Sequence, residues 1–183
     1  TCFFGCFDGH CGKRAAIWAK ENLAHNVEAE LSARAPKEAL QRAFVKTDAD
    51  FLERAWRENL NDGCTVTTAL LVGKDLYVAN AGDSRTILCH SQRDGMTMSN
   101  ATPLSIDHKP DRPSERQRIT AAGGTVTFLG CPRVNGVLAT SRGFGDKELK
   151  RWVSAEPEIQ HRCLGPGDDY LVLATDGLWD VLS

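Results

Sequence analysis

The sequence lacks several features that would place it in a functional class at once. No apolar run approaches the roughly 20 residues needed to cross a membrane, and no charged leader with a cleavage site precedes the first apolar segment. The formal net charge is only −2, and neither a long acidic tail nor a basic block is present. We therefore expect no membrane association and no nucleic-acid partner.

The seven cysteines lack the spacing of metal or redox motifs. Their number is odd and no Cys-x-x-Cys occurs, which argues against structural zinc and thioredoxin-like chemistry. Most of them lie in apolar stretches, where reduced thiols are commonly buried. These thiols predict a reducing, intracellular location, cytoplasmic or nuclear.

What the sequence does have is the composition of an ordinary folded domain. Its 183 residues are 42% hydrophobic and 25% charged, which is enough to bury a core. No internal repeat, low-complexity tract or linker divides the chain, so we predict a single domain over residues 1–183. Because Thr1 stands first and an apolar segment follows at once, we expect a fragment that begins inside a fold.

Hydrophobic periodicity predicts two helices followed by a run of strands. Apolar residues recur at helical spacing over residues 12–31 and 36–59. A short third helix is expected from a capping box at Ser114 to the glycine pair at 123–124. Residues 93–109 read mostly as loop. The expected strands are residues 2–7, 65–72, 76–81, 85–90, 125–129, 137–140 and 170–175. This order indicates an α+β fold with antiparallel strands.

Three aspartates, Asp8, Asp83 and Asp176, each stand just beyond an apolar predicted strand. If these strand ends converge, the carboxylates repel one another unless a cation lies between them. Carboxylate and carbonyl oxygens are hard ligands, so the expected ion is Mg²⁺ or Mn²⁺ rather than zinc. The glycine that neighbours each aspartate lets a backbone carbonyl approach the ion.

Two such ions about 3.5–4 Å apart can lower the pKa of a shared water and hold a phosphoryl group for attack. His10 lies two residues beyond Asp8, near the expected ions, where an imidazole can protonate a departing alkoxide. Each Asp-Gly pair can also be a plain turn. The three aspartates together with His10 favour a two-metal hydrolase.

Eight short motifs follow one another along nearly the whole chain. They are FGCFDGHCG at 4–12, DGCT at 62–65, ANAGDSR at 79–85, DHKP at 107–110, AGG at 122–124, SRGFGD at 141–146, EPE at 156–158 and DGLWD at 176–180. Each is weak alone, but together and in this order they are specific. The set resembles the metal-dependent protein phosphatases of the protein phosphatase 2C family.

The resemblance implies a four-layer α-β-β-α sandwich of antiparallel sheets with the metals at one end. It implies hydrolysis of phosphoserine or phosphothreonine in proteins by a metal-bridged water, without a phosphoenzyme. The cofactors would be two Mg²⁺ or Mn²⁺ ions, with a third, weaker site. The expected partners are phosphorylated protein substrates, and we expect a monomer.

Residue roles follow from the same resemblance. Asp8 is expected to bridge both metals, with the Gly9 carbonyl on one of them and Asp176 on the other. Asp83 and Asp180 match the weaker third site, although each can instead be a hydrogen-bond acceptor behind the ligands.

His10 matches the family's general acid. The sequence departs from the family pattern in three ways. Cys11 stands where the family usually has glycine, so a positive φ there would strain the backbone. Cys64 replaces a serine. The family's first strand, with a phosphate-binding arginine and acidic ligands, and its last acidic ligand are not in this chain. We therefore expect a domain truncated at both ends that is weak or inactive as a phosphatase by itself.

Other readings fit less well. A cysteine phosphatase would need an arginine where Ile17 stands, and the zinc-deaminase and dinucleotide-binding motifs are incomplete. The serious alternative is a non-catalytic regulator, or pseudophosphatase, on the same fold. The presence of both Asp8 and Asp176 favours catalysis over that alternative.

Three further features of the sequence have a structural or functional interpretation. The basic stretch is either a solvated helix face or a contact for phosphorylated substrate; it comprises Lys109, Arg112, Arg116 and Arg118. His108 is expected to be structural. Residues 147–152 fall where the family carries a variable flap, and we expect them to help select substrates.

Overall fold

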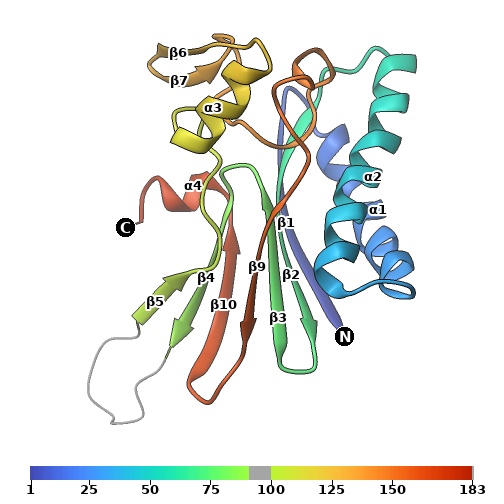
Figure 1. The fold of residues 1–183 in the computed structure, drawn as a ribbon, viewed down its shortest axis with the longest axis vertical. Helices are drawn as coiled ribbons and strands as arrows, with labels where there is room; N and C mark the ends of the chain where they lie inside the picture. The colour runs from blue at the N-terminus through green and yellow to red at the C-terminus, as the bar shows by residue number, and fades with distance from the viewer. Residues whose placement is uncertain (91–99, 183) are drawn as a thin grey trace.

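The computed structural model describes residues 1–90 and 100–182, which form two packed antiparallel sheets with helices outside (Figure 1). The larger sheet has the order β1-β2-β3-β9, and short β8 pairs with the start of β2. The bounds of these strands are β1 Cys2–His10, β2 Gly63–Val72, β3 Asp75–Ala81, β8 Phe144–Gly145 and β9 Glu158–Cys163. The smaller sheet has the order β10-β4-β5, with β4 Arg85–His90, β5 Asn100–Pro103 and β10 Asp168–Ala174.

Helices α1 (Arg14–Leu31) and α2 (Pro36–Arg57) lie side by side on the outer face of the larger sheet (Figure 1). A separate ribbon, β6 (Val126–Leu129) and β7 (Cys131–Val134), stands with α3 (Pro113–Ala121) above one end of the sandwich. The short α4 (Asp176–Trp179) follows β10, and the 3-10 turn η1 spans Lys147–Leu149. None of the described helices is long and apolar enough to span a membrane.

Strand β2 is buried on both faces because the helix pair covers one side and the second sheet covers the other. Toward the helices it presents Val66 and Leu70, which pack in one core cluster with Leu23, Phe44 and Phe51. The space between the sheets changes character along the strands. At one end it is apolar, filled by Ala69, Leu76, Val78, Leu88 and Leu104.

Toward the other end, paired hydroxyls link the two sheets. Thr67 and Thr86 are 2.8 Å apart at Oγ1, and Thr65 Oγ1 lies 2.7 Å from Ser84 Oγ. Buried hydroxyls need such partners. A polar lining therefore already exists where the strands end.

The α+β prediction is confirmed, with both long helices, the short third helix and most strands in the expected places. Within the described residues the helical layer covers the larger sheet alone, so three of the four expected layers are present. The expected loop at 93–109 was partly wrong, because Asn100–Pro103 forms β5; residues 91–99 lie outside the described residues.

Two local predictions were wrong, and some strands were missed. Residues 137–140 form no strand, because Asn135 (φ 51°) and Gly136 (φ 73°) turn the chain after β7 and leave only a bridge between Val134 and Leu138. Strands β7, β8 and β9 were not predicted. Ser114 does not cap α3, whose N-cap is Arg112 with proline following it.

Candidate functional site

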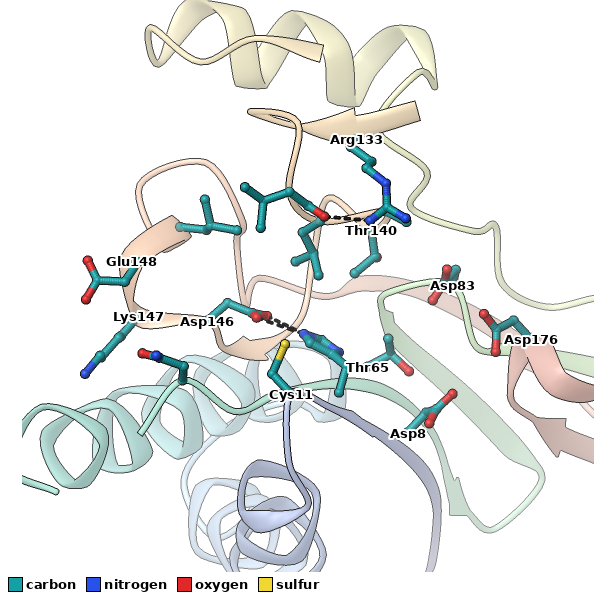
Figure 2. Close-up of a pocket in the computed structure, with 16 residues that line it drawn as sticks. Asp8, Cys11, Thr65, Asp83, Arg133, Thr140, Asp146, Lys147, Glu148 and Asp176 are labelled. Carbon is teal, nitrogen blue, oxygen red and sulfur yellow. Dashed lines mark hydrogen bonds and ion pairs between the residues drawn. The ribbon is translucent and has the colours of Figure 1, made fainter. Parts of the chain in front are cut away.

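A cavity of about 560 Å³ opens at the polar end of the sandwich. Its lining includes four side chains that the sequence singled out: Asp8, His10, Asp83 and Asp176. Figure 2 shows the three aspartates pointing toward one another on one side of the cavity. The structure thus brings together residues that lie up to 168 positions apart in the sequence, since 176 − 8 = 168.

The two sheets together create this arrangement. Asp8 and His10 are two residues apart near the end of β1, so both side chains point to the inter-sheet face. Asp83 lies in the turn between β3 and β4, and Asp176 begins α4 directly after β10. Because β1 and β10 belong to different sheets, the site forms only when the sandwich closes.

The carboxylates are close enough to disturb one another. Burial raises the pKa of Asp8, and the charges of Asp176 and Asp83 raise it further, as does a hydrogen bond with Asp176. Like charges held this close destabilise the ionised form unless a cation screens them. The site therefore carries an excess of negative charge.

Asp83 has a cationic partner, whereas Asp8 and Asp176 have no ion pair with a described residue. Lys109 Nζ lies 2.5 Å from Asp83 Oδ2. Burial lowers the pKa of Lys109, but the hydrogen bond and charge of Asp83 outweigh burial and raise it. This contact fits the alternative in which Asp83 is a hydrogen-bond acceptor.

Asp180 is not among the residues that line the cavity. It is exposed at the end of α4, where its charge raises the pKa of Arg85 after the larger effect of Asp107. Arg85 also lies over the ring of Trp179, 5.6 Å from its centroid. Asp180 lies one helical turn from Asp176 and donates its N–H to the Asp176 carbonyl, with a nitrogen–oxygen distance of 2.8 Å, but it does not line the cavity.

The donors fit the chemistry of a hard divalent cation. Among the described residues, no group of three or more His, Cys, Asp or Glu side chains could hold a metal ion by itself. Mg²⁺, however, is commonly bound through one or two carboxylates while it keeps several waters. Asp8 and Asp176 are cavity carboxylates without an ion pair to a described residue, so their oxygens are available to such an ion.

His10 has a partner that sequence reasoning missed. Its Nε2 lies 2.8 and 2.9 Å from the two carboxylate oxygens of Asp146. Burial lowers the pKa of His10, but the hydrogen bond and charge of Asp146 outweigh burial and raise it. Asp146 lies within one of the eight motifs, which was the available signal, but 136 positions separate the pair.

Arg133 was also missed, and it lines the wall opposite the acidic side chains (Figure 2). Its guanidinium donates to the carbonyl of Val137, with Nη1 2.6 Å from the oxygen. The expected flap contributes Lys147, Glu148 and Leu149 to the lining. The cavity therefore has an acidic side and an opposite wall that carries Arg133, whereas the Lys147 ammonium is held by Asn59, with Nζ 2.7 Å from Oδ1.

Most cations of the basic stretch form ion pairs within the protein. Arg112 pairs with Glu158 at 2.9 Å, and Arg118 pairs with Glu115 at 2.8 Å, while Lys109 pairs with Asp83. His108 is fully buried, and its Nδ1 lies 3.1 Å from the Gly82 nitrogen, which confirms its structural role. These cations therefore support the fold around the site.

The two cysteine departures have different consequences. Cys11 adopts a left-handed backbone with φ of 54° and lines the cavity, so the strain expected for a non-glycine residue is present. Cys64 is fully buried, and desolvation raises the pKa of its thiol far above the usual value. Cys64 is therefore an inert part of the core.

Comparisons with known proteins agree with this arrangement. The protein phosphatase 2C family model matches residues 1–183. Probable protein phosphatase 2C 56 of Oryza sativa subsp. japonica is 49% identical over 182 residues, covering 98% of this chain and 49% of that protein. Probable protein phosphatase 2C 59 of Arabidopsis thaliana is 47% identical over 186 residues, covering 98% and 56%.

Solved structures share the fold. A C. elegans sex determining protein superimposes with a TM-score of 0.90 at 26% identity, covering 99% of this chain and 44% of that one. A serine-threonine phosphatase 2C from Toxoplasma gondii gives 0.83 at 27% identity, covering 99% and 69%. The chain spans about half the length of the curated relatives it matches. In sequence and in fold, this chain belongs to the protein phosphatase 2C family.

Proposed function

We propose that this chain carries the catalytic centre of a metal-dependent phosphatase that hydrolyses phosphoserine or phosphothreonine in proteins. The observation that carries the proposal is the convergence of Asp8, Asp83 and Asp176 with His10 in one cavity. The mutual effect of these carboxylates on the pKa of Asp8 supports a site that needs positive charge.

Each residue has a distinct role in this proposal. Asp8 and Asp176, with the Gly9 carbonyl, hold Mg²⁺ or Mn²⁺, and Asp83 with Asp180 contributes to a third, weaker site. Bound divalent ions supply the activation of water and the neutralisation of phosphoryl charge.

His10 donates a proton to the seryl or threonyl oxygen as the P–O bond breaks. The cavity wall that carries Arg133 lies opposite the acidic side, and its guanidinium attracts the dianionic phosphoryl group. A phosphoprotein segment is the substrate class that suits a cavity of this size and charge.

We further propose that this chain acts as a monomer inside the cell, in the cytoplasm or nucleus. All seven cysteines are free in the structure, which suits a reducing compartment. Turnover by the 183 residues alone is expected to be weak, because their side chains supply few metal donors.

The alternative is a regulator that keeps the fold and turns over nothing. The ion pair between Lys109 and Asp83 favours it to a degree, since this contact neutralises one candidate ligand. The remaining excess of negative charge at Asp8 and Asp176 argues for catalysis.

Release of inorganic phosphate from a phosphothreonine peptide with Mn²⁺ separates the two functions. We expect metal-dependent release by a longer form of the protein, and a loss of at least ~100-fold in an Asp176→Ala variant. Asp169→Ala, an exposed aspartate on β10, is the matched control and keeps full activity. Activity that survives Asp176→Ala would refute the metal mechanism, and an inactive parent would favour the regulator.

A further inference from the structure

The geometry of the pair formed by His10 and Asp146 shows which nitrogen of the ring faces the carboxylate. Both carboxylate oxygens lie within hydrogen-bond distance of the same ring nitrogen, Nε2, at 2.8 and 2.9 Å. The Asp146 side chain is only 5% exposed, whereas that of His10 is 25% exposed and reaches the cavity. The carboxylate thus approaches the ring from the protein side.

The chemistry of the two groups decides where the proton sits. An ionised carboxylate only accepts hydrogen bonds, so Nε2 of His10 must carry the hydrogen. The neutral ring is then the Nε2–H tautomer. The other nitrogen, Nδ1, makes no hydrogen bond to any described residue.

Asp146 is itself held firmly. Its backbone is left-handed, with φ of 51°, and its N–H donates to the Asp62 carbonyl with a nitrogen–oxygen distance of 3.0 Å. The preceding residue, Gly145, pairs with Gly63 across the short β8–β2 ladder. Asp62 is anchored in turn by Arg14, whose Nη2 lies 2.6 Å from Asp62 Oδ1.

Gly63 leaves the room in which the pair meets. A Cβ at this position would overlap both His10 Nε2 and the Asp146 carboxylate. Two motifs that carry no role in the proposed reaction, at 62–65 and 141–146, therefore converge behind His10. Together the two motifs hold the imidazole ring of His10 in one orientation.

We propose that Asp146 is a positioning residue that holds His10 in the Nε2–H tautomer, so that Nδ1 delivers the proton in catalysis. The inference rests on the proposed function of His10 as general acid. As the bond between phosphorus and the seryl or threonyl oxygen breaks, the Nδ1 proton of the imidazolium moves to that oxygen. The alcohol leaves and the phosphoryl group passes to water as inorganic phosphate; the imidazolium becomes the neutral ring with Nε2–H on Asp146, and solvent then returns a proton to Nδ1.

The tautomer is measured directly by ¹⁵N NMR of the histidine rings, in the chain labelled at histidine and at a pH where the rings are neutral. We expect His10, assigned through His10→Gln, to show Nδ1 as the unprotonated nitrogen and a slowly exchanging Nε2–H. In Asp146→Gly, which tolerates the positive φ, that proton signal is lost to exchange. Asp111→Gly, an exposed aspartate before α3, is the control and leaves it unchanged.

A second variant guards against a folding defect. Asp146→Asn also suits a left-handed backbone, and its amide can accept from or donate to Nε2, so we expect the single tautomer to become a mixture. An Nδ1–H tautomer in the unaltered chain, or a ring spectrum that neither substitution changes, would overturn the proposal. This readout needs no turnover, so it stays decisive if the phosphatase proposal fails.

A turnover readout separates positioning from general damage. The phosphothreonine leaving group needs a proton, whereas p-nitrophenolate departs as a stable anion. We expect Asp146→Asn to lower kcat for the phosphopeptide by about 100-fold more than for p-nitrophenyl phosphate, since general acid catalysis supplies about that factor. Equal losses on both substrates would assign Asp146 to structure alone.

Discussion

Beside His10, the backbone of Cys11 lies in the left-handed region, and no glycine is there to relieve it. The left-handed conformation costs a residue with a Cβ roughly 1–2 kcal/mol. The sequence anticipated this strain from the family pattern, because glycine is usual at the position. The strained residue lines the cavity, next to the proposed general acid.

We expect Cys11→Gly to stabilise the protein by up to about 1 kcal/mol, since relief of the strain exceeds the entropy that glycine adds to the unfolded chain. Urea unfolding measures the change. Cys163→Gly, at the exposed end of β9 and without a positive φ, is the matched control and should lose about 0.5–1 kcal/mol. Equal destabilisation by both substitutions would mean that Cys11 is not strained.

At the scale of elements, the short strand β8 connects the site to the helix pair. Gly145 donates its N–H to buried Asp48 of α2, with the nitrogen 2.7 Å from Oδ1. Its φ is 75°, and a Cβ there would overlap the carbonyl oxygen of Asp62. The strand therefore needs glycine for both conformation and space.

We expect Gly145→Ala to destabilise the protein by about 3 kcal/mol, the sum of left-handed strain and steric overlap. Gly73→Ala is the matched control, because Gly73 also has a positive φ (63°) but open space around it. Strain alone should cost that control about 1 kcal/mol. Thermal unfolding of both variants gives the comparison, and equal losses would show that the overlap is relieved at no cost.

The elements that the sequence predicted well are those whose apolar residues follow one period. Strand β2 is a continuous buried run, and α1 and α2 each bury one apolar stripe. The sequence did not predict strand β9 because this strand is polar. It lies at a sheet edge, where His161 stacks on Tyr77 with ring centroids 4.6 Å apart. An edge strand needs no apolar alternation to pair.

The candidate site was predictable only in part for the same reason. Asp8, Asp83 and Asp176 stand at strand ends, which local sequence reveals. The bond between His10 and Asp146 joins the end of β1 to the residue after β8, 136 positions away, and no local pattern connects the two. Likewise, the ion pair between Lys109 and Asp83 depends on packing between separate segments. The sequence alone therefore suggested a more solvated basic stretch than the structure has.

At the scale of the whole molecule, a buried ionic network joins α3, β9 and the loop before β8. Glu115, 1% exposed, accepts from Arg142 and Arg118, with the nearest nitrogens at 2.6 and 2.8 Å. Burial raises the pKa of Glu115, but these arginines outweigh burial and lower it to about 2. His108 lies in the same network, 3.5 Å from Glu158.

This network predicts a loss of stability in mild acid. Burial, followed by the charge of Arg142, lowers the pKa of His108 to about 4. The folded protein keeps the ring neutral, while the unfolded chain binds a proton below about pH 6.5. The contribution of the neutral ring is therefore complete above pH 6.5 and is lost as the pH falls toward 4.

Urea unfolding at pH 7.5, 6 and 5 tests this expectation. The free energy of unfolding should fall across the series, and His108→Gln should flatten the part of the slope between pH 6.5 and 5. His25→Gln, on an exposed position of α1, should leave the slope unchanged. An unaltered slope in His108→Gln would place the acid sensitivity elsewhere.

We propose that two separate sheets bring Asp8 and Asp176 together to hold divalent ions. Anomalous diffraction from a crystal of the chain soaked in millimolar Mn²⁺ tests it most directly. We expect an anomalous peak within coordination distance of both carboxylates, and its disappearance in Asp176→Ala. Manganese bound only elsewhere, or none at this end of the sandwich, would contradict the claim.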